Sequence, residues 1–265
     1  MNRLAALAGA TVLALGIATP ACAYQMFFGN DTNGSNTVPL ATFPNATAAR
    51  TSFLSNLVGV GTENFETRSG SAPLALTFPG AGAATLNGTG TVAVVTPDTT
   101  NGFGRYATSG SHYWEVSASS TTATFIVDLG LPIAAFGFFG IDIGDFDGQL
   151  SVRVTKTNAS TQIINVPHPT GGGTTGGQNG SVLYFGLIAS SAAEQFTKIE
   201  FLNTDTVGTD TDTFGFDDMT IGSLQQVCTG NCPVPEPDVL ALLAVAGLGF
   251  GAIRRTRRPR DTKAT

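Results

Sequence analysis

The sequence predicts a mainly β protein: a single β-sandwich, jelly-roll-like, with one short N-terminal helix and a C-terminal membrane helix. Short runs rich in Thr, Val and Phe recur along the chain, and Gly, Asn, Asp or Pro falls in nearly every gap between them. In residues 150–155, Leu and Val alternate with Ser, Arg and Thr, which indicates a strand with one buried face. The roughly 200 residues between the two ends are enough for one hydrophobic core.

Ten segments have the composition of strands. They are Pro73–Phe78, Thr91–Thr96, His112–Ser117, Thr122–Leu129, Ile133–Ile143, Gln149–Lys156, Gln162–Val166, Val182–Ile188, Thr197–Asn203 and Thr213–Ile221. One segment, Asn45–Val58, has helical periodicity, and Asn45 can cap its first turn. Its apolar face consists of Ala49, Phe53, Leu54, Leu57 and Val58. The glycine-rich stretch Gly171–Gly180 is expected to be a long hairpin connection between Val166 and Val182.

The first 23 residues are predicted to be a secretory signal peptide (1–23). Arg3 precedes an apolar stretch from Leu4 to about Ala18, and a small-residue step, Ala-Cys-Ala, comes just before Tyr24. The apolar stretch is too short to span a membrane stably. Signal peptidase is therefore an expected partner, and the sandwich domain (24–224) is expected outside the cytoplasm.

The predicted exported body is acidic. Residues 24–233 contain 6 Lys and Arg against 16 Asp and Glu, a net charge of 6 − 16 = −10, whereas the whole chain carries −6. Such a surface repels phosphate backbones, which excludes nucleic acid as a partner. The two cysteines of the expected linker (225–233), Cys228 and Cys232, are predicted to close a small disulfide loop, because no further metal ligands lie nearby.

The C-terminal tail is predicted to hold a membrane helix at 239–253. This uncharged run follows Pro235 and Pro237 and is followed at once by Arg254 and Arg255. Its 15 residues reach only about 22 Å against a hydrocarbon core of about 30 Å, but arginines can snorkel to lengthen a short span. Basic residues stay on the cytoplasmic side, so the body is expected on the outside.

Residues 234–260 resemble the PEP-CTERM sorting domain of Gram-negative bacteria. The resemblance rests on Pro235-Glu236-Pro237, an apolar helix with small residues, and the cluster that begins with Arg254 and Arg255. It implies an exosortase as a processing partner. It also implies a protein held in the inner membrane by its tail before processing, and then placed in the cell envelope or extracellular matrix.

Three acidic clusters could carry chemistry. Glu66 follows Asn64 and Phe65, and Asp217 with Asp218 follows Phe214-Gly215-Phe216; these segments resemble the first and last strands of galactose-binding-like jelly rolls. That resemblance implies a structural Ca²⁺ bound by Glu66, Asp217 and Asp218. The third cluster, Asp142, Asp145 and Asp147, is spaced somewhat like an oxygen-ligand loop, but it lacks the closing glutamate of an EF-hand. We interpret it as a set of solvated turn acids.

Aromatic residues suggest a place for a sugar. Tyr113 and Trp114, next to Glu115, could form a stacking platform, since aromatic faces pack on apolar ring surfaces; both could instead be core residues. A pair formed by Glu66 and Glu115 could in principle serve a glycosidase. No Gly-x-Ser-x-Gly elbow or His-Glu-x-x-His motif is present in the sequence, and we expect no enzyme.

Several body segments, among them residues 134–150 and 214–222, resemble a group of PEP-CTERM proteins with no established reaction. The sequence thus predicts a non-catalytic binding or structural component of the envelope or matrix, associated with exopolysaccharide. The alternatives are an envelope polysaccharide hydrolase and a purely structural adhesin or coat protein. The sequence names neither the ligand nor the oligomeric state.

Overall fold

A computed structural model of the chain describes residues 24–119, 122–145, 147–170, 178–204 and 211–228. The predicted signal peptide and the predicted sorting tail lie outside these residues, and so does the predicted membrane helix at 239–253. Within the described part, no helix has both the length and the apolar character needed to cross a membrane.

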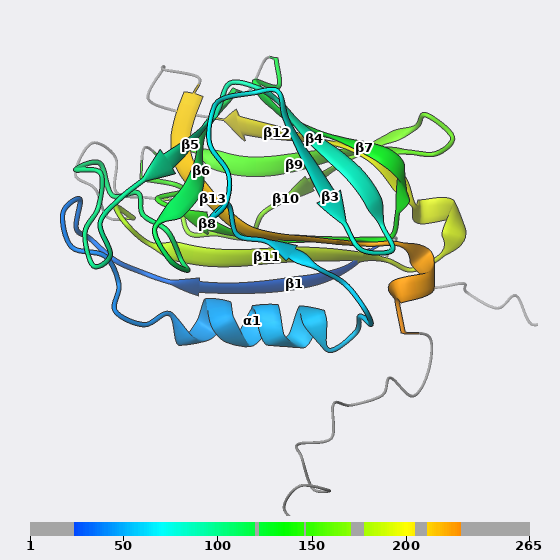
Figure 1. The fold of residues 1–265 in the computed structure, drawn as a ribbon, viewed down its shortest axis with the longest axis horizontal. Helices are drawn as coiled ribbons and strands as arrows, with labels where there is room; N and C mark the ends of the chain where they lie inside the picture. Colours follow the sequence, from blue (N-terminus) through cyan, green and yellow to red (C-terminus); the bar gives the residue numbers. More distant parts are fainter. Residues whose placement is uncertain (1–23, 120–121, 146, 171–177, 205–210, 229–265) are drawn as a thin grey trace, which may run out of the picture.

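Two antiparallel sheets pack face to face in a β-sandwich, as the sequence predicts (Figure 1). The first sheet has seven strands in the order β1-β11-β8-β13-β6-β5, with β2 beside β13. Its strands are β1 (Tyr24–Asp31), β2 (Thr62–Glu63), β5 (Thr91–Val94), β6 (His112–Ser119), β8 (Ala135–Ile141), β11 (Val182–Ala189) and β13 (Thr211–Gly222). The second sheet has six strands in the order β10-β9-β12-β7-β4-β3. Its strands are β3 (Leu74–Phe78), β4 (Gly82–Gly88), β7 (Phe125–Ile133), β9 (Gln149–Lys156), β10 (Thr161–Asn165) and β12 (Phe196–Thr204).

Each of the ten predicted strands is confirmed, with ends that differ by at most a few residues. The sequence reading missed β1, β2 and β4. β1 begins directly after the expected cleavage site, so its residues were not separated from the leader. β2 has only 2 residues. β4 has the Gly- and Ala-rich sequence GAATLNG, which has little β-propensity. These three segments form strands because they pair with neighbouring strands, which the local sequence does not show.

The chain crosses repeatedly between the sheets. β6 lies in the first sheet, β7 in the second, β8 in the first, and β9 and β10 in the second again. The prediction that Gly171–Gly180 belongs to a hairpin is therefore wrong, because the connection leads from β10 at the edge of the second sheet to β11 in the first. The composition marked a loop, but the strands that a loop joins depend on tertiary pairing.

Phenylalanine rings from both sheets fill the space between them. Phe201 of β12 packs on Phe125 of β7, with ring centroids 4.5 Å apart, and meets Phe138 of β8 across the sandwich at 5.3 Å. Phe216 of β13 lies 4.9 Å from Phe138 and 5.2 Å from Phe125. All four rings are fully buried. Because a buried aromatic ring removes about 150–250 Å² from water, this cluster contributes strongly to the stability of the sandwich.

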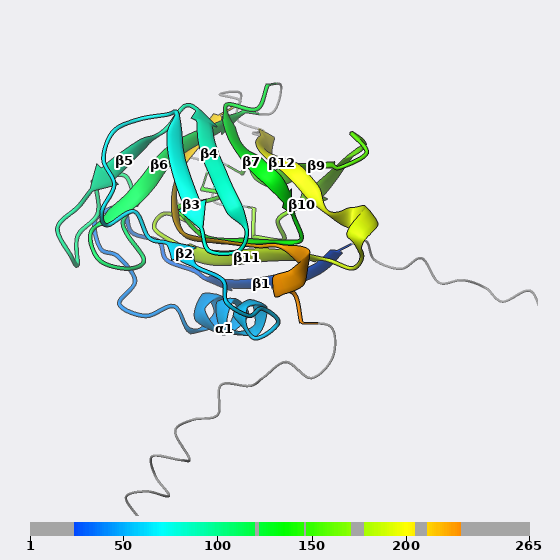
Figure 2. The same cartoon turned by 45° about the vertical axis from the view of Figure 1, so that its right-hand side comes forward.

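Helix α1 (Pro44–Leu54) covers the outer face of the first sheet along β1 and β11 (Figures 1 and 2). The prediction that Asn45 caps this helix is wrong. Asp31, at the end of β1, accepts hydrogen bonds from the backbone N–H groups of Asn45 and Ala46 at 3.2 and 2.8 Å. A carboxylate here satisfies free N–H groups and suits the positive end of the helix dipole. The helix also ends four residues before the predicted Val58, in a turn after Leu54.

The described chain stays attached to the sandwich through Cys228. The backbone N–H of Cys228 donates to the carbonyl of Asn56 at 2.9 Å, and Nε2 of Gln226 donates to the carbonyls of Gly59 and Pro79 at 2.7 and 3.0 Å. The packed body therefore extends a few residues beyond the predicted boundary at 224. Cys228 is disulfide-bonded, and its predicted partner, Cys232, lies outside the described residues.

An ion pair on the outer face of the second sheet makes stability depend on pH. Nε and Nη2 of Arg153 donate to the two carboxylate oxygens of Glu200 at 2.8 and 2.9 Å, and these bonds lower the pKa of Glu200 below its ordinary value of 4.5. A carboxylate whose pKa is depressed on folding adds stability that is present above its unfolded pKa and is lost as the pH falls through its folded pKa.

We therefore expect Glu200→Gln to lower the free energy of unfolding by about 1 kcal/mol at neutral pH, since the pair is partly exposed. Most of this difference should disappear as the pH is lowered to about 3. Urea unfolding of both proteins at the two pH values measures the effect. A loss of the same size at both would show that the charge of Glu200 is not its cause.

Candidate functional site

The three predicted calcium ligands all contact one segment, residues 108–112, which leads into β6. Asp217 is fully buried and accepts hydrogen bonds from N and Oγ1 of Thr108, both at 2.8 Å, and from the backbone N–H of Asp218 at 2.7 Å. Burial, with a contribution from the charge of Asp218, raises the pKa of Asp217 to about 8 in spite of these donors.

Glu66 and Asp218 hold the rest of the segment. Oε1 of Glu66 accepts hydrogen bonds from the backbone N–H groups of Ser111 and His112 at 2.7 and 2.6 Å. Burial acts to raise the pKa of Glu66, but the donors of His112 and Ser111 outweigh it, and the pKa is lowered. Oδ1 of Asp218 accepts a hydrogen bond from Oγ of Ser109 at 3.0 Å.

These carboxylates act as anchors for a loop. Their hydrogen-bond partners are N–H and O–H donors, so hydrogen atoms are directed at the oxygens that a cation would need. The result is that residues 108–112 are fastened to β13 and to the turn that holds Glu66. A calcium ion shared by Glu66, Asp217 and Asp218 would have to displace these donors, and it stays a prediction.

The predicted stacking platform is wrong for both of its residues, because Tyr113 and Trp114 are fully buried. Trp114 points into the core, where its ring stacks on Phe65 with centroids 6.2 Å apart. Tyr113 points to the opposite face of β6, where its hydroxyl donates to Oε2 of Glu115 at 3.3 Å. A ring needs one solvent-exposed face to stack on a sugar, and neither ring has one.

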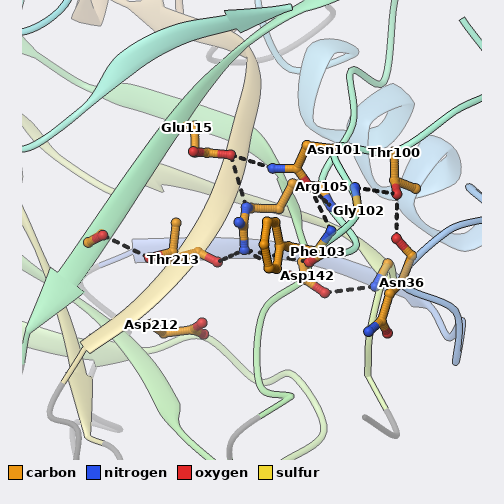
Figure 3. Close-up of polar contacts among 12 residues, drawn as sticks. Asn36, Thr100, Asn101, Gly102, Phe103, Arg105, Glu115, Asp142, Asp212 and Thr213 are labelled. Carbon is orange, nitrogen blue, oxygen red and sulfur yellow. Dashed lines mark hydrogen bonds and ion pairs between the residues drawn. The ribbon is translucent and has the colours of Figure 1, made fainter. Parts of the chain in front are cut away.

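Arg105 ties three elements together on the outer face of the first sheet (Figure 3). Its Nε donates to Oε2 of Glu115 at 3.0 Å, while Nη1 donates to the carbonyl of Thr213 at 3.1 Å and to Oδ2 of Asp142 at 3.4 Å. Nδ2 of Asn101 donates to the same Glu115 oxygen at 2.6 Å. One guanidinium thus joins β6, the start of β13 and the loop after β8, and it fixes the carboxylate of Glu115.

An open cleft of about 250 Å³ lies beside this ion pair, over β5, β6 and β13. It offers one carboxylate and several hydroxyl groups, from Thr89, Thr91, Glu115, Ser117 and Thr213. Phe103 lies against the guanidinium of Arg105, with Cζ 5.4 Å from the ring centroid, and 66% of Phe103 is exposed. An exposed aromatic ring and a polar cleft are therefore linked through Arg105 (Figure 3).

The prediction that Asp142, Asp145 and Asp147 are solvated turn acids is wrong for two of them. Asp142 and Asp145 are buried, with 1% and 6% exposed. Near them lies Asp212 at the start of β13, which is 3% exposed. Burial, together with the charge of Asp145, raises the pKa of Asp142 to about 8, although the backbone N–H of Gly180 donates to Asp142 at 2.8 Å. The pKa of Asp212 is raised well above its ordinary value, by burial and by the charge of Asp145.

Sequence reasoning missed Arg105, Phe103 and Asp212 as site residues. Phe103 stands between Gly102 and Gly104, both of which adopt positive φ values. An aromatic residue in such a glycine-bounded loop, rather than in a strand, is the signal that indicates an exposed ring. For Arg105 and Asp212 no local pattern exists, because their partners come from distant segments.

Comparisons with known proteins leave the family open. No family model matches the sequence, and no curated protein matches it. Among solved structures, the C-terminal family 22 carbohydrate-binding module of Clostridium thermocellum Xyn10B is 14% identical; the match covers 66% of this chain and 98% of the module, with a TM-score of 0.37. The K2 cleaved adhesin domain of Lys-gingipain is 13% identical over 61% of this chain and 98% of that domain, with a TM-score of 0.36. At these scores the likeness carries no argument about ligand or activity.

Proposed function

We propose that the protein is an exported envelope or matrix component whose β-sandwich, of jelly-roll type, binds a neutral polysaccharide without cleaving it. The observation that carries this proposal is the exposed ring of Phe103 on Arg105, next to a cleft lined by Glu115 and hydroxyl groups. A sugar ring can stack on Phe103 while its hydroxyls bond to the cleft.

The geometry of Glu115 suits this role. Its Oε2 is held by Asn101, Arg105 and Tyr113, so the carboxylate is fixed in advance, while 28% of the side chain remains exposed to the cleft. A carboxylate held in this way can accept hydrogen bonds from sugar hydroxyls with little loss of side-chain entropy. The net charge of −10 over residues 24–233 repels acidic polymers, which is why a neutral one is proposed.

The proposed address rests on the two ends of the sequence. A leader cut by signal peptidase and a tail processed by an exosortase would bring the acidic body to the cell envelope or the extracellular matrix. There an exopolysaccharide is the polymer that the cleft would meet. A hydrolase, the first alternative, would shorten that polymer, and a purely structural coat or adhesin protein, the second, would leave the cleft unused.

The proposal is tested by Phe103→Ala in the full-length protein, with a panel of neutral and acidic oligosaccharides as probes. Loss of one stacked ring should weaken binding of the neutral probes by about two- to tenfold, since an aromatic contact contributes roughly 0.5–1.5 kcal/mol. Isothermal titration measures the affinity. Ile163→Ala is the matched control, because Ile163 is 58% exposed on β10, in the other sheet, and this substitution should change nothing. Equal affinities for wild type and Phe103→Ala would remove the cleft from consideration.

A further inference from the structure

Two strands of opposite sheets meet at one end of the sandwich with polar side chains turned inward. In β12, Phe201 belongs to the core, so Asn203, two residues later, points into the same space. In β13, Phe214 belongs to the core, so Asp212, two residues earlier, points inward from the opposite sheet. β12 ends just after Asn203 and β13 begins just before Asp212, so both lie at the same end.

The described residues of the connection from β8 to β9, 142–145 and 147–148, contact these two side chains. The backbone N–H of Gly144 donates to Oδ2 of Asp212 at 3.4 Å. At the other end of the connection, Gly148 lies directly against Asn203: a Cβ on Gly148 would be 2.6 Å from Oδ1 of Asn203. Asp145 lies between these two glycines, is buried, and acts through its charge on Asp212. Asp145, Asp212 and Asn203 are therefore all buried at this end of the sandwich, around the two glycines of the connection.

Three buried polar atoms of Asp212 and Asn203 have no hydrogen-bond partner among the described residues. Oδ1 of Asp212 and both amide atoms of Asn203 are unpartnered, although Asn203 is only 1% exposed. A buried polar group without a partner loses its hydrogen bonds to water and gains none, so native proteins rarely keep one without a reason. The nearby cation is Arg105, which is already shared between Glu115 and Asp142.

We propose that Asp145, Asp212 and Asn203 bind one calcium ion at this end of the sandwich. No group of three His, Cys, Asp or Glu in the described part of the chain could hold a metal ion, so the amide oxygen of Asn203 is an essential member of the set. Backbone carbonyls and water would complete the six to eight oxygens that calcium takes, at about 2.3–2.6 Å. The ion would join the two sheets, since Asn203 lies on β12 and Asp212 on β13.

The available donors select calcium over other divalent ions. The imidazole of His168 lies against Gly144, but both of its ring nitrogens already form hydrogen bonds. Nδ1 donates to the carbonyl of Pro169, and Nε2 accepts from the backbone N–H of Leu150, both at 2.9 Å. Carboxylate and amide oxygens remain, which suit a hard cation rather than zinc. Magnesium demands near-octahedral geometry and gives up its water reluctantly, whereas calcium accepts irregular sites.

The test is thermal unfolding of the full-length protein after treatment with EDTA, with and without added calcium. With free calcium at about a hundred times its Kd, the unfolding midpoint of the wild type should rise by about 5–10 °C. The same concentration of magnesium should raise it by less than half as much. A midpoint that calcium leaves unchanged would overturn the proposal, and an equal rise with magnesium would overturn the assignment to calcium.

Two variants should change the calcium-dependent rise of the unfolding midpoint in opposite directions. Asp212→Asn should lose the calcium-dependent rise, yet unfold in EDTA at or above the wild-type midpoint, because it replaces a buried carboxyl group next to Asp145 by a neutral amide of the same shape. Asn203→Asp should unfold at a lower temperature in EDTA and show a larger rise with calcium, because it adds a charged ligand.

Two controls locate the site. Asp128→Asn, on the exposed face of β7, should keep the full rise with calcium. Glu66→Gln should also keep it. A rise lost in Glu66→Gln but kept in Asp212→Asn would place the ion at the carboxylates that anchor residues 108–112 and would overturn the proposal. The outcome is independent of the oligosaccharide titrations, so either proposal can fail alone.

Discussion

Phe216→Ala is expected to lower the free energy of unfolding by about 4 kcal/mol, because it leaves a cavity where both sheets meet. Phe216 is fully buried, and its ring lies within 6.5 Å, centroid to centroid, of five other rings. Those rings belong to Phe65, Phe125, Phe136, Phe138 and Phe201. Four of these neighbouring rings lie on strands β7, β8 and β12, which belong to both sheets. The movement of a single side chain therefore cannot fill the cavity. Equilibrium urea unfolding measures the loss.

Phe103→Ala is the matched control for this prediction. It removes the same atoms from a ring that is 66% exposed, so the free energy of unfolding should fall by less than about 1 kcal/mol. If the two substitutions cost the same, the phenylalanine cluster would not be the centre of stability that the packing indicates.

Gly29→Ala is expected to lower the free energy of unfolding by about 3 kcal/mol, for the opposite reason of too little space. Gly29 lies in β1 beneath the start of helix α1, and a Cβ there would be 2.1 Å from the carbonyl oxygen of Asn45. The obstacle is backbone, so relief requires the helix to move away from the sheet. That movement would also break the hydrogen bonds from Asn45 and Ala46 to Asp31.

The control for Gly29→Ala is Gly34→Ala, since a Cβ at Gly34 meets no atom within 4 Å. Urea unfolding should give a change within about 0.5 kcal/mol for Gly34→Ala. A comparably small change for Gly29→Ala would mean that the contact between α1 and β1 yields easily and contributes little to stability.

The sandwich could be predicted because its strands are written in local patterns. The alternation of apolar and polar residues in β9 and the turn residues between strands are visible within a few consecutive residues. Both predict the observed strands. β4 failed the same test, since its glycines and alanines are strand residues only because β3 and β7 pair with it on either side. The predicted cap of α1 was wrong for the same reason. Asp31, which contacts the start of the helix at Asn45, lies on a strand 14 residues earlier in the sequence.

The candidate site was less accessible to prediction, for the same physical reason. Acidic residues were recognised as clusters, but their roles depend on what faces them. Asp217 meets backbone donors of a loop more than a hundred residues earlier in the chain, whereas Asp145 is buried and acts through its charge on Asp212. Burial also decided the aromatics: strand alternation placed Trp114 in the core, and a glycine-bounded loop placed Phe103 outside.

The central claim is that the cleft beside Arg105 and Glu115 binds a neutral polysaccharide and leaves it intact. The most direct measurement is isothermal titration of the full-length protein with neutral oligosaccharides, followed by chromatography of the same samples. We predict a saturable heat of binding with at least one oligosaccharide and products of unchanged length. No heat with any member of the panel, or the appearance of shorter oligosaccharides, would contradict the account.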